Sequence, residues 1–265
     1  VNGAPIPPIE VESSFLDRYE VTNADYQEFV AAGGYEERRY WEGLDFGKDR
    51  RLPAWQDAMR LFVDSTGRPG PATWELGDYP TGRERHPVNG VSWYEAAAYA
   101  RFRGKVLPTV YHWAKAGLPW IPEGGLTASI VPASNYGSDG PAPVGIYPGI
   151  GPFGTYDMHG NVSEWVSNAS SSDRAWTLGG SFQDAAYNFF AGVQVARLER
   201  SPHVGFRLMR AAGGATTPSL QNAIELTPKP IGQPASDEVY SAYIQQFVYS
   251  SGDLMRLHLL LESTD

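Results

Sequence analysis

Glycine and proline recur along the whole chain instead of gathering in one segment, and this limits how much regular structure it can form. The 265 residues include 29 glycines and 21 prolines, well above the combined ~12% that is usual. Because glycine admits backbone conformations closed to other residues and proline lacks an amide donor, both interrupt helices and strands. Hydrophobic residues make up 42%, so we expect a folded core surrounded by many turns and loops.

Local signals of secondary structure are concentrated in a few segments. Ser92 and Glu95 form a capping box ahead of the run AAAYARF, which predicts a helix there. The run VYHWAKAG, preceded by Thr109 and closed at Gly117, predicts a second helix. Elsewhere the sequence predicts an extended segment over 5–16, helices over 22–30 and 53–63, and short strands over 176–182 and 204–210.

A change of composition near residue 211 marks a boundary within the chain. Residues 213–235 are rich in proline, glycine and polar residues, which is typical of a linker. After it, SDEVYSAYIQQFVY repeats apolar residues at helical spacing, which predicts an amphipathic helix over 236–249. We therefore expect a main domain over 1–212, the linker, and a C-terminal helix and tail over 236–265 that can begin a further domain.

Charge and cysteine content exclude several classes of function. The chain has a net charge of −9 and no basic stripe, which argues against a nucleic-acid partner. It has no apolar run near the ~18 residues that a transmembrane helix requires, so we expect no membrane span in this chain. Cysteine is absent, which excludes disulfides, thiolate metal sites and thiol nucleophiles.

The other residue types that often carry chemistry form no familiar catalytic motif. The chain contains no GxSxG elbow, no GxGxxG loop and no Walker loop. Its histidines do not pair at a metal-ligand spacing, which favours ordinary hydrogen-bonded histidines over an iron or zinc site assembled from distant positions. The five histidines are His86, His112, His159, His203 and His258.

The stretch GTYDMHGNVSEW, residues 154–165, combines two carboxylates with a glycine between them. Calcium binds several carboxylate and carbonyl oxygens at once. Asp157 and Glu164 can supply side-chain oxygens, and Gly160 and Val162 can supply backbone carbonyls. The alternative is a capped turn, in which Asp157 accepts hydrogen bonds from backbone amides and Glu164 pairs with an arginine. The spacing alone leaves both interpretations open.

Five segments in a fixed order make the chain similar to a known family. They are YEVTNADYQEFV, HPVNGVSWYEAAAYARFRGKVLPT, FGTYDMHGNVSEW, LGGSF and GFRLMR, between about residues 15 and 210. Together they resemble the formylglycine-generating enzyme domain, also called the sulfatase-modifying factor domain. GGYEERRYW, GRPGPATWELGDYP and LPTVYHW resemble the branch fused to bacterial Ser/Thr protein kinases. We therefore expect this chain to be the middle piece of such a protein.

The resemblance implies a fold and a metal site. The fold would be α+β, a loop-rich variant of the C-type lectin fold, followed in this chain by the C-terminal helical appendage. One structural calcium ion is implied at Asp157, Gly160, Val162 and Glu164. The family's second calcium loop would match the residues after Asn135, where SNYGSDGPAP is short, so we do not expect a second ion.

The cysteines that the resemblance implies for catalysis are missing. Formylglycine-generating enzymes use two cysteines after the GGS motif to bind copper and activate oxygen. The matching positions hold Asp184 and Phe189, whereas a soft Cu(I) ion requires sulfur ligands. We therefore expect copper-dependent formylglycine formation to be lost. Relatives that form sulfur–carbon bonds use iron held partly by an HxxxEH motif, which is absent here as well.

The leading hypothesis is a non-catalytic sensory or scaffolding module that binds a peptide or a small polar ligand. The resemblance places Ser181, Asp184 and Arg197 near the family's active-site groove, where they would contact such a ligand. For Arg197 the alternative is a pairing with an acid in the core. The rival hypothesis is a metal-dependent oxidoreductase of the same family with altered chemistry. Further domains of the parent protein are the other expected partners. The compartment stays open, with an extracytoplasmic part of a membrane-bound bacterial kinase protein as one option.

Overall fold

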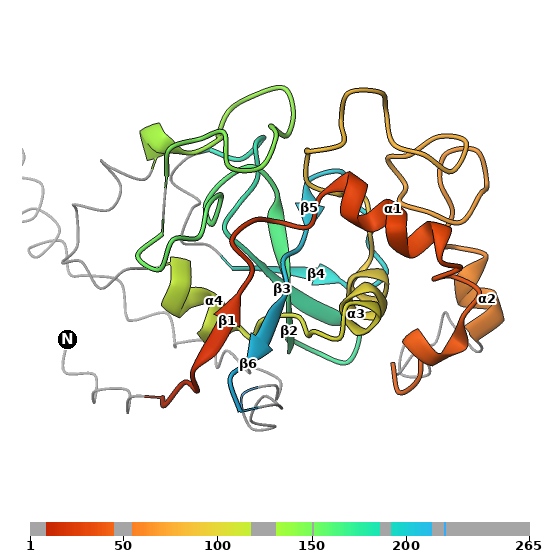
Figure 1. Cartoon of the computed structure of the whole chain (residues 1–265), viewed down its shortest axis with the longest axis horizontal. Helices are drawn as coiled ribbons and strands as arrows, with labels where there is room; N and C mark the ends of the chain where they lie inside the picture. Colours follow the sequence, from red (N-terminus) through yellow and green to blue (C-terminus); the bar gives the residue numbers. More distant parts are fainter. Residues whose placement is uncertain are drawn as a thin grey trace, which may run out of the picture. The chain divides into compact units, whose positions relative to one another are not determined.

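Strands from the second half of the described chain form the central sheet. The structure is a computed structural model that describes residues 9–44, 55–117, 131–149, 151–185, 192–213 and residue 220. Within these residues the sheet has the order β4-β3-β2-β5, with β2 antiparallel to β3 and parallel to β5 (Figure 1). A two-stranded antiparallel sheet pairs β1 with β6. The strands are β1 (Ser14–Leu16), β2 (Ser163–Ala169), β3 (Arg174–Leu178), β4 (Val193–Ala196), β5 (Val204–Gly205) and β6 (Met209–Ala211).

Short helices, two of them begun by capping boxes, occupy the first half of the chain. The Thr22 side chain accepts a hydrogen bond from the Asp25 amide, and the Asp25 carboxylate accepts one from the Thr22 amide. Ser92 and Glu95 make the same reciprocal pair, which satisfies amides that the first turn leaves without partners. The helices are α1 (Asn23–Ala31), α2 (Trp55–Met59), α3 (Trp93–Phe102) and α4 (Val110–Gly117), with 3₁₀ turns η1 (Arg38–Tyr40) and η3 (Val131–Ala133).

The helix predictions are more accurate than the strand predictions. The helix starts expected at Thr22, Ser92 and Thr109 are confirmed, while α2 is shorter than the helix expected over 53–63. Strands β2 and β4 were not predicted, and β2 begins inside the stretch interpreted as a loop, at Ser163. Almost all of β2 is buried. A strand that is buried on both faces lacks the alternation of polar and apolar residues that marks a strand in sequence.

Aromatic side chains from α1, α3 and the segment after β5 make the main core. The rings of Tyr26 and Tyr99 stack with centroids 5.1 Å apart, and Phe206 meets Tyr99 edge to face at 5.5 Å. All three side chains are buried, and such ring pairs add to the stabilisation from burial. This packing also fixes the chain on either side of the rings, so Glu20 ahead of α1 and Arg207 after Phe206 have defined positions.

The chain divides into two compact units, Val1–Glu225 and Leu226–Asp265. All residues that the structure describes belong to the first unit. The C-terminal helical appendage expected over 236–265 lies outside the described residues, as does nearly all of the linker expected over 213–235.

Candidate functional site

The motif stretch 154–165 is a tight turn that leads into β2. Asp157 and Asn161 have φ angles of 53° and 59°, and Gly160 has a φ of 77°. Asparagine and aspartate tolerate this left-handed region better than other side chains. Gly160 is required for a second reason, because a Cβ there would lie 2.5 Å from the backbone oxygen of Asn135. The turn therefore presses the motif against the loop that contains Asn135.

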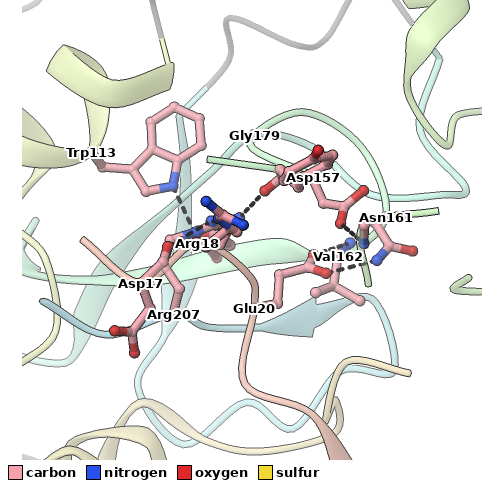
Figure 2. A network of polar contacts seen from close by, with 12 residues as sticks. Asp17, Arg18, Glu20, Trp113, Asp157, Asn161, Val162, Gly179 and Arg207 are labelled. Carbon is pink, nitrogen blue, oxygen red and sulfur yellow. Dashed lines mark hydrogen bonds and ion pairs between the residues drawn. The ribbon is translucent and has the colours of Figure 1, made fainter. Parts of the chain in front are cut away.

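A buried ion pair holds the start of β2. Arg207 donates from Nε and Nη2 to the Glu164 carboxylate at 2.6–2.9 Å, and Trp113 Nε1 donates to Glu164 Oε2 at 2.8 Å. Both charged side chains are fully buried. The remaining Arg207 donors reach the backbone oxygens of Asp17, Arg18 and Tyr156. Figure 2 shows Arg207 at the centre of this network with Trp113 beside it.

Glu20 brings a second buried carboxylate to the same turn. Its Oε1 accepts from the Val162 amide at 3.2 Å and its Oε2 accepts from Asn161 Nδ2 at 2.7 Å (Figure 2). Burial raises the pKa of Glu20 well above its ordinary value, and the negative charges of Asp157 and Glu164 raise it further. Burial and the neighbouring carboxylates thus favour the neutral form of Glu20 in the folded state.

Asp157 is the third carboxylate near this turn, and it caps the loop that contains Gly145. Its Oδ2 accepts from the Gly145 amide at 2.6 Å. Burial raises the pKa of Asp157, and the negative charge of Glu164 adds to the rise, although the Gly145 amide and Arg207 oppose it. Both contacts of the capped-turn interpretation are thus present: Asp157 bonds a backbone amide and Glu164 pairs with an arginine.

These contacts bear on whether the predicted residues fit a calcium ion. Within the described residues no three His, Asp or Glu side chains converge as a metal-binding group, so carbonyls would have to complete the site. Glu164 fits only if it shares its carboxylate with Arg207. Glu164 is the carboxylate that pairs with Arg207, and the raised pKa values of Glu20 and Asp157 favour their neutral forms, so a dication would have to displace their protons to gain charge here. Calcium at Asp157, Gly160, Val162 and Glu164 therefore stays a prediction.

Of the three residues expected to contact a ligand, the structure brings two together. The amide and hydroxyl of Ser181 both donate to Asp184 Oδ2, at 2.7 and 2.8 Å. Gly180, with a φ of 70°, separates this carboxylate from Tyr136: a Cβ on Gly180 would lie 3.7 Å from Asp184 Oδ2 and 3.4 Å from the Tyr136 hydroxyl. Burial raises the pKa of Tyr136, and the charge of Asp184 raises it further. We call this space the Gly180 notch.

Arg197 is engaged elsewhere. Its guanidinium lies over the ring of Trp93, 4.7 Å from the ring centroid, in a cation–π contact. Its amide donates to the backbone oxygen of Asp173 at 2.8 Å. Among the ion pairs of the described residues there is none between Arg197 and Asp184, and none between Arg197 and any other acid. Phe189, at the second position matched to a catalytic cysteine, lies outside the described residues.

Sequence reasoning did not select Glu20, Arg207, Trp113 or Asn161 as site residues. One signal was available: Arg207 interrupts the apolar run VGFRLM, and a charge placed among buried residues needs a partner. The identity of that partner depends on tertiary contacts between segments 43 residues apart, which no local pattern reveals.

A comparison with known families decides what scaffold this is. Residues 2–212 match the sulfatase-modifying factor enzyme 1-like domain, the family of the formylglycine-generating enzymes. The chain belongs to this family. The resemblance drawn from the five motifs is confirmed, as are the α+β, loop-rich fold expected from it and the occurrence of the sulfatase-modifying factor domain in a protein kinase.

Curated relatives of this sulfatase-modifying factor domain include enzymes and a kinase. The mouse formylglycine-generating enzyme is 33% identical over 195 residues, which cover 62% of this chain and 51% of the relative. The Ser/Thr protein kinase pkn1 of Chlamydia caviae is 34% identical, with 62% and 24% covered. The hercynine oxygenase of Mycobacterium tuberculosis is 34% identical, with 63% and 40% covered. The chain thus spans about half, or less, of the length of these relatives.

Solved structures with a similar arrangement include CarF and PvdO from Pseudomonas aeruginosa. Each is 20% identical with a TM-score of 0.49. CarF is matched over 75% of this chain and 86% of its own, and PvdO over 74% and 79%.

Proposed function

We propose that this domain is a non-catalytic sensory or scaffolding module, built on the formylglycine-generating enzyme scaffold, that binds a peptide or small polar ligand for a larger protein. The observation that carries the proposal is the pairing of Asp184 with Ser181. Asp184 occupies the position of the family's first catalytic cysteine. Its Oδ2 accepts hydrogen bonds from the Ser181 amide at 2.7 Å and the Ser181 hydroxyl at 2.8 Å, within the same turn. A chain with no cysteine offers no thiolate to Cu(I).

We place the ligand at the Gly180 notch. Tyr136 and Asp184 flank it, and the glycine leaves free the space that any side chain would fill. The half-buried Tyr136 hydroxyl and Asp184 carboxylate on either side of the glycine suit amide and ammonium donors, as in a peptide. The Tyr136 hydroxyl donates to the Gly179 backbone oxygen at 2.6 Å, which fixes one side of the notch before a ligand arrives.

The binding test uses a displayed peptide library and the intact chain. Peptides selected on the wild type should bind at least tenfold more weakly to Asp184→Lys, which reverses the charge at the notch. Binding should persist in Asp139→Lys, an exposed position in a neighbouring loop. Selection of no peptide, or equal binding by both variants, would remove the notch as the binding surface.

The rival proposal is a metal-dependent oxidoreductase, which the names of the curated relatives favour. Elemental analysis of the purified chain separates the two. Copper or iron near one equivalent, together with oxygen consumption on a thiol substrate, would establish an enzyme. As a matched control, Asp184→Cys combined with Phe189→Cys restores the family's two sulfur positions. We expect Cu(I) binding by this double variant and not by the wild type.

The kinase relative, of which this chain covers 24%, supports a multidomain setting for this domain. We propose that other domains of the parent protein receive the signal of ligand binding. The described residues include no helix long and apolar enough to cross a membrane. Placement outside the cytoplasm, as in a membrane-bound kinase protein, remains part of the proposal, and protease accessibility in intact cells tests it.

A further inference from the structure

A polar cavity lies where the chain passes from β1 into α1, beside the C-terminal end of α3. Its volume is about 240 Å³. Glu20 contributes to its wall, but no residue of the Gly180 notch does. The side chains that matter for recognition are three cations, Arg18, Arg103 and Lys105, and two further carboxylates, Asp17 and Asp25.

Opposite charges meet at the mouth of this β1–α3 cavity in pairs that water can reach. Lys105 Nζ lies 2.5 Å from Asp17 Oδ1, and the two side chains are 34% and 31% exposed. Arg103 lies 4.0 Å from Asp25 and pairs more closely, at 2.6 Å, with Glu28. Ion pairs as exposed as these contribute little to stability, so either partner can turn to a ligand at small cost.

One cation at the cavity has no acidic partner. Within the described residues Arg18 takes part in no ion pair, and its backbone oxygen is the group that bonds Arg207. With Glu28 counted, three acids equal the three cations in number, but Asp25 and Glu28 both lie at Arg103 and Asp17 lies at Lys105, so among the described residues Arg18 is the cation without an acid at ion-pair distance. A ligand that brings a carboxylate would therefore be balanced here.

The floor of the cavity is apolar. Val21, Tyr99 and Leu208 line it, and all three side chains are at most 5% exposed. A hydrocarbon group that contacts these side chains would lose its own contact with water, which favours binding. The volume is below the ~300–1,000 Å³ common for drug-sized ligands, which limits the occupant to a small molecule.

We propose that the β1–α3 cavity binds a small zwitterion of the α-amino-acid class. Its carboxylate would pair with Arg18 and Arg103, its ammonium group with Asp17 and Asp25, and its side chain would contact the apolar lining. The three parts of an amino acid match the three kinds of surface in the cavity. This inference does not depend on the Gly180 notch, since it uses other residues and another ligand class.

The test is calorimetric titration of the whole chain with three matched small molecules. L-alanine carries both charges, propanoate carries only the negative charge and ethylamine only the positive charge. We expect L-alanine to bind at least tenfold more tightly than either of the others. Equal binding of propanoate would make this an anion site and overturn the proposal, and so would the absence of L-alanine binding.

Two variants assign the binding to the cavity. Asp17→Asn and Arg103→Gln should each weaken L-alanine binding at least tenfold, and partial exposure of both side chains makes unfolding unexpected. Arg60→Gln, in an exposed pair with Asp57, serves as the control. A further variant that exchanges Asp17 and Lys105 keeps their pairing but should still lose L-alanine. Unchanged binding in the cavity variants would place the amino acid elsewhere and refute the assignment.

Discussion

At the residue scale, Asp64 illustrates how one buried carboxylate can organise a loop. Its Oδ1 accepts from the Thr66 amide and hydroxyl and from the Arg68 amide at 2.8–3.0 Å, and its Oδ2 accepts from the Gly77 amide at 2.6 Å. Burial alone would raise the pKa of Asp64, but these hydrogen bonds outweigh burial and lower it. The charged form is therefore the one that the loop requires.

Substituting Asp64 with asparagine should destabilise the domain. Asparagine has one acceptor oxygen in place of two, so we expect the free energy of unfolding at pH 7 to fall by about 1–3 kcal/mol. Because folding lowers this pKa, the contribution of Asp64 is present above the unfolded pKa of ~3.9 and is lost as pH falls through the folded value. Urea denaturation of both proteins at pH 7 and pH 3 measures this. The difference between them should shrink at the lower pH, and a constant difference would contradict the assignment.

Glu20 should influence stability in the opposite direction. Its pKa is raised on folding, so the folded state takes up a proton. Its stabilising contribution is complete below the unfolded pKa of ~4.3 and is lost as pH rises through the folded value. Glu20→Gln removes the titrating group but keeps an acceptor oxygen, so the variant should lose less stability than the wild type as pH rises from 5 to 8. Parallel pH profiles from urea denaturation would show that Glu20 is ionised throughout.

At the element scale, the Glu164–Arg207 pair joins β2 to the segment after β5, and Trp113 ties α4 to the same carboxylate. Removing one partner of a buried pair leaves a bare charge, so Arg207→Met should lower the free energy of unfolding by about 3–5 kcal/mol. Glu164→Gln combined with Arg207→Met removes both charges and should be less destabilising than Arg207→Met alone. Chemical denaturation of the wild type, Arg207→Met and the double variant measures these differences. A double variant less stable than Arg207→Met would mean that the two side chains stabilise the fold by packing and not by their charges.

The same elements show what could be predicted from the sequence. Helix starts depend on neighbouring residues, so Thr22 and Ser92 were identifiable from three-residue spacings. The start of β2 was not, since the left-handed residues Asp157 and Asn161 precede it and its buried faces show no alternation. The partners of Glu20 and Glu164 were hidden for another reason: they are set by tertiary packing across the chain.

At the scale of the whole molecule, membership of the formylglycine-generating enzyme family could be predicted because the five motifs occur in the family's order, although the catalytic cysteines are replaced. The same reading located Asp184 at a catalytic position but placed Arg197 beside it, whereas Arg197 packs on Trp93. Membership of a family therefore predicts the fold better than it predicts the contacts of individual side chains, and the role of each side chain needs its own test.

Calcium is the prediction that concerns the whole domain, because an ion at the motif turn would link Asp157 to loops from distant parts of the chain. Burial raises the pKa of Glu20 and Asp157 when no ion is bound, and a dication at the turn would favour their ionised forms. We expect about one equivalent of bound calcium, and a binding ion stabilises the folded state in proportion to its concentration above Kd. Thermal unfolding with added calcium, and with a chelator, should show a higher and a lower Tm respectively.

The variant Asp157→Asn makes the calcium test specific. It preserves an acceptor for the Gly145 amide and a side chain compatible with φ of 53°, yet it removes a charge that the ion needs. The rise in Tm with calcium should therefore shrink strongly in Asp157→Asn and persist in Asp139→Asn. If the wild type shows no calcium response, the ion pair of Glu164 with Arg207 holds this turn without a metal, and the calcium prediction is wrong. Glu164 itself is a poor probe, because its substitution breaks that ion pair whether or not calcium binds.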